Sequence, residues 1–161
     1  MDLTSGYGGR PTIGALMTLC EENYLALLRL APELPRLRGS FVSRRGEGAD
    51  LLLDVGEQAP FTTALRLTHL FAGTGERSAW RAEPDARLRA YHDARQVEVL
   101  GLRQTALPLL GDYKPPALAA KWKANFFIAK WLGYCLAQGH RFPAVVVHHT
   151  ERRDRDPLPA S

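Results

Sequence analysis

Apolar residues recur with the period of an α-helix in the first part of the chain. Between residues 13 and 30 they share one helical face. These positions are Ile13, Leu16, Met17, Cys20, Tyr24, Leu27 and Leu28. Thr12 is a favourable N-cap residue, and Pro32 and Pro35 end the pattern because proline cannot continue a helix. The sequence therefore predicts an N-terminal helix over residues 13–30.

The middle of the chain changes to a period of two, which is typical of half-buried strands. Stretches that contain glycine and proline separate the alternating runs, and one of them predicts a loop over 72–84. The connections are too short for parallel crossovers, so we predict an antiparallel meander of about five strands. The expected strands cover residues 41–42, 51–55, 63–67, 87–92 and 96–102.

A second long helix is predicted over residues 117–138, after Pro115-Pro116 and before Gly139 as its C-cap. Its apolar residues form two faces, so the helix is buried almost all round. One face holds Leu118, Trp122, Phe126, Ala129, Leu132 and Leu136. The other holds Phe127, Ile128, Trp131, Tyr134 and Cys135. That second face packs inside the same chain or meets a second subunit, and the second case predicts self-association through the 117–138 helix.

These patterns predict an α+β fold: an antiparallel meander flanked by an N-terminal and a C-terminal α-helix that pack on one face. We expect a flexible leader over 1–11, a single domain over 12–147 that includes a short edge strand near 142–147, and a disordered charged tail over 148–161. A hydrophobic fraction of 45% and a charged fraction of 24% suit one ordinary domain and exclude collagen, coiled coil and wholesale disorder.

Neither the hydropathy nor the cysteine count points outside the cytoplasm. No apolar run is long enough to span a bilayer, so we expect no membrane association. Two cysteines are too few for a disulfide framework, which favours a reducing, cytoplasmic setting.

The net charge of +4 comes from one segment. Six Lys and Arg residues lie within 101–141, where Asp112 is the only acidic residue. Such a segment is typical of a solvated surface or of an anion-binding one. Trp122, Phe126 and Trp131 alternate with lysines there, but they follow helical spacing and are better explained as core. We therefore do not expect nucleic-acid binding.

Three segments together resemble one known family. They are residues 16–24 with 28–32 (LMTLCEENY and LRLAP), residues 91–94 with 97–99 (YHDA and VEV), and residues 131–139 (WLGYCLAQG). In this order they resemble the bacterial YqiB-like proteins, an uncharacterised family, over roughly residues 13 to 147. The resemblance implies a small cytoplasmic bacterial protein without a settled activity, so it assigns no catalytic residue.

The candidate site from the residues themselves centres on Tyr91-His92-Asp93. A histidine beside a carboxylate can act as a general base, because the carboxylate orients the ring and stabilises its charged form. Adjacent residues of a strand point to opposite faces, however, and aspartate at a hairpin corner often bonds its own backbone. A functional site and a structural turn are both compatible with the sequence.

Glu21 and Asn23 complete the candidate set together with Lys114. Asn23 points into an apolar sector of the first helix, where its amide needs a hydrogen-bond partner. That partner is a loop carbonyl, or else Asn23 and Glu21 line a pocket. The ligand-binding set is then Tyr91, His92, Asp93, Glu21, Asn23 and Lys114.

Cys20 and Cys135 with His92 suggest a zinc site only weakly. The sequence contains no CxxC or HxxxH spacing that would supply ligands locally, and free cysteine is among the most buried residue types. We therefore predict a core role for both cysteines, and neither a metal nor another cofactor.

Two functions follow from these observations. The leading hypothesis is a non-enzymatic cytoplasmic binding or interaction domain with an unknown protein partner, either monomeric or homodimeric. The alternative is a small enzyme or ligand-binding domain for a phosphorylated or otherwise anionic metabolite, acting through the Tyr91-His92-Asp93 region. The sequence leaves open whether any reaction is catalysed.

Overall fold

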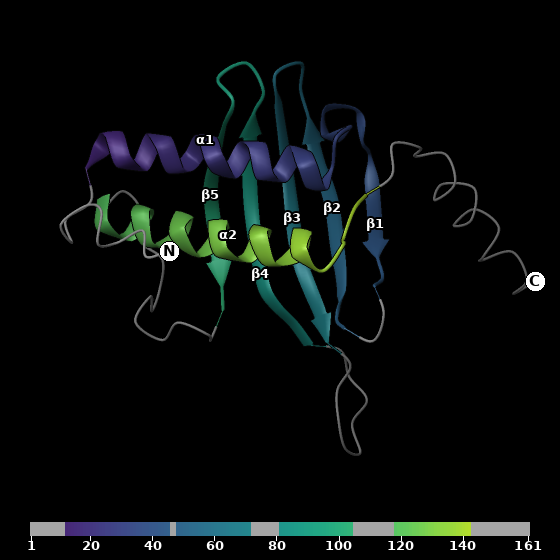
Figure 1. Ribbon diagram of the computed structural model, residues 1–161. Coiled ribbons are helices and arrows are strands. Elements are labelled where there is room, and N and C mark those ends of the chain that lie inside the picture. Colours follow the sequence, from purple (N-terminus) through teal and green to yellow (C-terminus); the bar gives the residue numbers. More distant parts are fainter. Residues whose placement is uncertain (1–11, 46–47, 72–80, 105–117, 143–161) are drawn as a thin grey trace, which may run out of the picture.

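Two helices lie side by side across one face of a five-stranded antiparallel sheet in the computed structural model (Figure 1). The structure describes residues 12–45, 48–71, 81–104 and 118–142. The elements, in chain order, are α1 (Ile13–Leu30), the short 3-10 helix η2 (Leu34–Arg36), β1 (Gly39–Ser43), β2 (Asp50–Gln58), β3 (Thr62–Phe71), β4 (Arg81–Tyr91), β5 (Gln96–Arg103) and α2 (Leu118–Ala137). The predicted α+β meander with two helices on one face is confirmed.

Helix α1 has the predicted bounds, but it buries a different stripe from the predicted one. Thr12 caps it, because its Oγ1 accepts a hydrogen bond of 3.0 Å from the Ala15 backbone N–H. The buried residues are Ala15, Leu19, Asn23, Tyr24, Leu27 and Leu30. Ile13 and Met17 remain 67% and 53% exposed, so their assignment to the buried face was wrong. The helix is rotated so that the small Ala15, rather than its larger neighbours, faces the interior.

The sheet follows the chain, in the order β1-β2-β3-β4-β5. Its inner face packs on the helices and its outer face is open to solvent, as antiparallel sheets commonly are. Leu51 and Leu53 of β2 are fully buried on the inner face, and so is Leu67 of β3, which pairs with Leu53. The side chains that are almost completely buried are Phe41, Phe142, Leu27, Leu30, Leu34, Leu37, Leu51, Leu53, Leu67, Leu88, Ile128 and Leu132.

Strands β2 and β4 both extend beyond their predicted ranges. Strand β2 continues through Gly56 and Glu57 to Gln58, across a register shift that follows Val55. Strand β4 begins at Arg81, so the predicted loop over 72–84 runs too far. The register places Glu83 and Pro84 opposite His69 alone, because Thr68 pairs with Asp85 and Leu70 with Ala82. Such a bulge accommodates a proline that regular pairing would exclude.

Helix α2 is buried by its own chain along most of its predicted second face and only partly along the first, where Leu118, Phe126, Ala129 and Leu136 are half-buried. It packs against α1 and also contacts β5. Of the predicted second face, only Tyr134 is exposed, at 56%, whereas Phe127, Ile128, Trp131 and Cys135 are buried. Self-association through this helix stays a prediction, and Tyr134 is the side chain of that face that a partner would meet.

The chain leaves α2 in a tight turn and returns to α1. Gly139 has a φ of 89°, a conformation that suits glycine at a helix C-terminus. The Phe142 N–H then donates to the Leu30 carbonyl at 2.9 Å, which anchors this segment beside the end of α1. Neither described long helix has the length and hydropathy needed to cross a membrane. The predicted leader, the edge strand beyond Phe142 and the charged tail lie outside the described residues.

Candidate functional site

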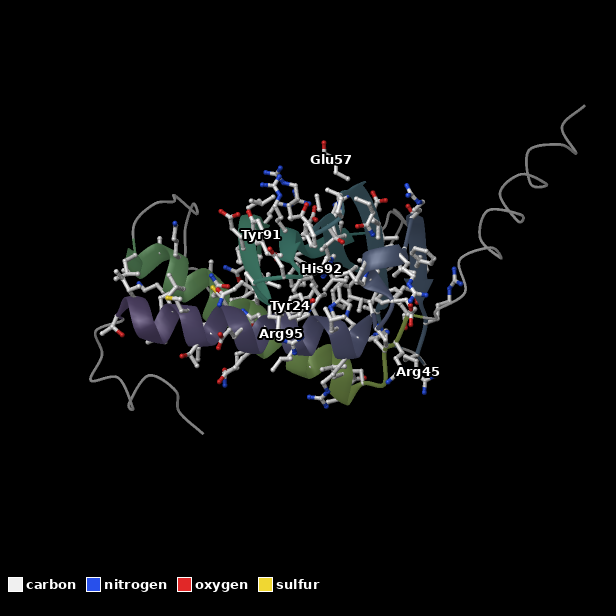
Figure 2. All side chains as sticks on the ribbon, turned by 90° about the horizontal axis from the view of Figure 1, so that it is seen from above. Tyr24, Arg45, Glu57, Tyr91, His92 and Arg95 are labelled. Atoms are coloured by element: carbon white, nitrogen blue, oxygen red, sulfur yellow. The ribbon has the colours of Figure 1, made fainter. Side chains whose placement is uncertain are left out.

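His92 lies at the centre of a hydrogen-bonded chain that joins three parts of the fold. It opens the turn between β4 and β5, so the prediction that placed it at the end of a strand was wrong by one residue. Its Nδ1 is 2.9 Å from the hydroxyl of Tyr24 on α1, and its Nε2 is 2.8 Å from Oγ1 of Thr63 on β3. The Thr63 hydroxyl in turn donates to Gln58 Oε1 at 2.6 Å. In Figure 2, His92 and Tyr24 lie next to one another between the sheet and α1.

The hydrogen-bond donors in this series of side chains fix the tautomer of His92. Gln58 Nε2 donates to the carbonyls of Leu34 and Leu37, both at 2.8 Å, which leaves Oε1 as its acceptor. The Thr63 proton goes to that acceptor, so Thr63 Oγ1 accepts from His92 Nε2–H. His92 Nδ1 is then unprotonated and accepts from the Tyr24 hydroxyl. Burial lowers the pKa of His92, against the opposing effect of Asp93, so the ring is neutral near pH 7.

The side chains of the three consecutive residues of the predicted site bond to different parts of the structure. The exposed Asp93 accepts a 2.9 Å hydrogen bond from the Ala94 N–H through Oδ1, as turn aspartates do. Tyr91 donates its hydroxyl proton to Glu98 Oε1 at 2.8 Å. His92 turns inward to Tyr24, whose ring also lies 5.5 Å from the guanidinium of Arg95. The structure thus joins His92 to the core and Tyr91 to β5, and it does not bring the three side chains to one point.

Replacement of His92 by alanine is expected to destabilise the protein by about 2 kcal/mol, because it leaves the Tyr24 hydroxyl without its acceptor and Thr63 Oγ1 without its donor. Asp93→Ala removes one hydrogen bond at an exposed turn and is expected to cost less than about 1 kcal/mol. Urea denaturation followed by circular dichroism measures both. Equal effects of the two substitutions would contradict the assignment of His92 to a structural network.

A half-open groove of about 310 Å³ lies where α1, α2 and β5 meet, and we call it the β5 groove. Leu16 and Cys20 come from α1, Lys121 and Asn125 from α2, and four consecutive residues from β5. The full lining is Leu16, Cys20, Tyr91, Ala94, Gln96, Val97, Glu98, Val99, Lys121 and Asn125. Tyr91 is the member of the predicted ligand set that lines it.

Asn23 supports one wall of the β5 groove from behind. It is 1% exposed, and its Nδ2 donates to the backbone carbonyl of Asn125 at 3.0 Å and to Oδ1 of Asn125 at 3.3 Å. Asn125 Nδ2 donates to the Lys121 carbonyl, one turn earlier in α2, at 2.9 Å. The predicted need of Asn23 for a partner is therefore met, for its Nδ2, by a helix rather than by a loop, whereas its buried Oδ1 has no partner among the described residues. Glu21 is exposed and does not line the groove, and Lys114 lies outside the described residues.

The two cysteines differ in their surroundings. Cys135 is fully buried, as predicted, whereas Cys20 is half-buried in the wall of the β5 groove. Burial raises the pKa of Cys135 to about 12 and that of Cys20 to about 11. Both thiols are therefore protonated at neutral pH and are poor nucleophiles. Among the residues that the structure describes, no group of three or more His, Cys, Asp and Glu side chains could hold a metal ion.

A second polar cluster is buried beneath the C-terminal half of α2. The indole N–H of Trp131 donates to His69 Nδ1 at 2.9 Å, and His69 Nε2 is 4.0 Å from the Cys135 sulfur. The ring of His140 is 5.8 Å from that of His69, and its Nδ1 lies 2.8 Å from Ser43 Oγ. Burial lowers the pKa of His69 to about 4, and the neighbouring His140 contributes to this shift.

Sequence reasoning missed Asn125 and His69, although signals for both were present. Asn125 is a polar residue in an apolar helix, the same signal that identified Asn23. His69 continues the alternation of Leu65 and Leu67, and the predicted strand ended too early to include it.

The fold and the groove define a two-layer α+β domain with a half-open hollow at one edge of its sheet. Comparison with known proteins gives the family. The model of a family described as a protein of unknown function (DUF1249) matches residues 26–141, and the chain belongs to this family.

The uncharacterized protein YqiB of Escherichia coli strain K12 is 32% identical over 135 residues, which cover 80% of this chain and 91% of that protein. YqiB of strain O157:H7 matches equally well. These matches confirm the resemblance to the YqiB-like family. No solved structure matches the chain.

Proposed function

We propose that this chain is a non-enzymatic binding domain whose ligand occupies the β5 groove. The groove itself carries this proposal. Its volume of about 310 Å³ lies at the small end of ligand sites, and its walls are largely apolar with a few polar groups. Sites of this composition are typical of binding, because apolar contacts supply affinity and the few polar groups supply orientation.

The states of the candidate catalytic groups favour binding over catalysis. Both ring nitrogens of His92 are engaged by Tyr24 and Thr63, so the ring has no free position at which to accept a substrate proton. Cys20 is the thiol in the groove, and its raised pKa keeps it protonated. Both cysteines of the chain are free thiols, which supports our placement of the protein in the cytoplasm.

The groove is also better suited to a ligand than the hollow on the open face of the sheet. That hollow, of about 340 Å³, is lined by Arg66, Arg87 and Arg89 together with Glu57. Four charged side chains in one hollow are typical of a solvated surface, whereas two line the β5 groove. In Figure 2, Glu57 extends from this face, away from the helices.

A fragment screen by ¹H–¹⁵N NMR tests the proposal. Apolar and anionic fragments are expected to shift the amide signals of Val97, Val99 and Lys121. Leu16→Trp fills the groove and is expected to abolish these shifts. The matched control is Met17→Trp, the next residue, which is exposed and lies outside the groove lining. Shifts that persist in Leu16→Trp, or that cluster away from β5, would rule out the groove as the binding site.

One observation favours a second candidate, a domain for an anionic metabolite. Lys121 supplies a positive charge to the groove that Tyr91 also lines. Lys121 supports the anion-binding part of this hypothesis. The part that assigns the binding to His92 and Asp93 is not supported in the same way, because both side chains hydrogen-bond within the fold. Inorganic phosphate and simple carboxylates in the fragment set separate this candidate from a ligand that is bound through apolar contacts.

A further inference from the structure

Strand β5 forms one edge of the sheet. It pairs on one side with β4, from Gln96 opposite Tyr91 to Arg103 opposite Asp85, and no described strand lies along its other side. The backbone groups of an antiparallel strand alternate in direction, so part of the N–H and C=O groups of β5 point away from the sheet. A free strand edge of this kind is a ready template for another extended chain.

The β5 groove follows this edge rather than one face of the sheet. Gln96, Val97, Glu98 and Val99 are consecutive, and all four line it. Successive side chains of a strand point to opposite faces, so a groove that touches four in a row passes over the strand's edge. On the inner side, Leu16 of α1 and Asn125 of α2 form the facing wall. The hollow is thus bounded by a strand edge and two helices.

The groove holds one charge of each sign, on different walls: Glu98 lies on β5 and Lys121 on α2. Glu98 already accepts the hydroxyl proton of Tyr91 at 2.8 Å. The ammonium group of Lys121 forms no ion pair with any residue that the structure describes. Glu98 keeps its negative charge in that hydrogen bond, so the place in the groove that suits a carboxylate is the α2 wall, beside Lys121.

We infer that an extended segment of a partner protein binds as an added strand along β5, with one apolar side chain in the β5 groove and one carboxylate beside Lys121. This inference rests on the proposed function and names the class of its ligand. A strand edge offers donors and acceptors at the repeat of an extended backbone, about 3.3 Å per residue, which a peptide matches along its length. Strand addition supplies affinity through the main chain, and the groove supplies selectivity for alternate side chains.

Selection from a phage-displayed library of random peptides on the immobilised full chain tests the inference. Enriched peptides are expected to alternate apolar with polar residues and to include Asp or Glu. A fluorescein-labelled synthetic copy of one such peptide then gives the Kd by anisotropy. Lys121→Glu is expected to weaken binding at least about tenfold, because it reverses the charge in the groove. The control Lys123→Glu changes an exposed lysine of the same helix outside the groove lining, and should leave the Kd within about twofold.

A proline scan of the peptide tests strand addition without altering the protein. Proline removes a backbone N–H, so binding should be lost at every second position, where the peptide donates to β5. A helical peptide would instead show sensitivity throughout its central turns and anchors every three or four residues. That result would overturn the inference, and so would an unchanged Kd in Lys121→Glu.

The remaining outcomes separate the inference from the proposed function. No enrichment from the library, together with groove shifts by fragments, would overturn the inference and leave the binding domain in place. No enrichment and no groove shifts would overturn both. A dimer by light scattering that dissociates in Lys121→Glu would assign the edge to a second copy of this chain instead of a peptide. Circular dichroism of each variant confirms that the fold is retained.

Discussion

Trp131→Ala is expected to lower the free energy of unfolding by about 4 kcal/mol. Trp131 is 5% exposed and lies between α2 and β3, where its indole N–H donates to His69 at 2.9 Å. Its ring centroid is 5.6 Å from that of His69 and 6.3 Å from that of Phe127. Truncation to alanine thus removes a large buried side chain and also leaves His69 Nδ1 without its donor. In a domain of this length the loss corresponds to a fall in Tm of roughly 12 °C.

One further substitution separates the loss of the hydrogen bond from the loss of the buried ring, and a second serves as a control. Trp131→Phe keeps an aromatic ring and removes the N–H, so we expect a loss of about 2 kcal/mol from the unpaired His69 nitrogen and the smaller ring. Tyr134→Ala is the matched control, because Tyr134 is an aromatic residue three positions along α2 that is 56% exposed. It should change stability by less than about 0.5 kcal/mol. Similar losses for Trp131→Ala and Tyr134→Ala would show that the contact between α2 and β3 is not as described.

Acidification is expected to destabilise the protein between about pH 6.5 and pH 4, mainly through His69. In the folded state the pKa of His69 is lowered to about 4, first by burial and then by repulsion from His140. The unfolded chain, with an ordinary histidine pKa near 6.5, binds this proton first. The stabilisation is therefore complete above pH 6.5 and is lost as the pH falls towards 4. For His69 this loss amounts to at most about 3 kcal/mol.

His92 and His140 also make the folded state less stable as the pH falls. Burial lowers the pKa of each, and in His140 the charge of Arg45 adds to the effect while Asp50 opposes it. In Figure 2, Arg45 lies well away from Tyr91 and His92, so the two histidine environments are separate. Urea denaturation at several pH values between about 7 and 4.5 measures the combined slope.

The variant His69→Gln isolates the contribution of His69. Its side-chain oxygen can still accept from the Trp131 N–H, but it does not titrate. We expect the variant to show a flatter dependence of stability on pH than the natural sequence. An NMR titration of the His69 ring that gives an ordinary pKa near 6.5 would contradict the burial of this residue.

The β5 groove is a candidate functional site for the DUF1249 family. The family match covers residues 26–141, which include Val97, Val99, Lys121 and Asn125 of the groove lining. The α1 wall, formed by Leu16 and Cys20, precedes that match. Lys121→Glu therefore tests a wall of the groove that lies within the family match, and Leu16→Trp tests a wall that lies outside it.

The candidate site could be predicted only in part, for a physical reason. The sequence identified Asn23 as a polar residue on an apolar helix face that needs a hydrogen-bond partner, and His92 as part of a functional site or of a structural turn. It did not identify Asn125 as the partner of Asn23. Nor did it identify Thr63 as the partner of His92, or Gln58 as the acceptor of the Thr63 proton. These partners are 102, 29 and 5 residues away from the groups that they bond, and local periodicity carries no information on such contacts.

What the sequence determined by itself were the features that depend on local backbone preference. The period of 3.6 and the cap at Thr12 define α1, and short connections between alternating runs permit only an antiparallel meander. The tertiary structure alone decided how α1 is rotated, that Pro84 lies at a bulge inside β4, and that the second apolar face of α2 is buried, except at Tyr134, by its own chain. It also decided that a groove forms along β5, because that groove exists only where two helices and a strand edge far apart in the sequence meet.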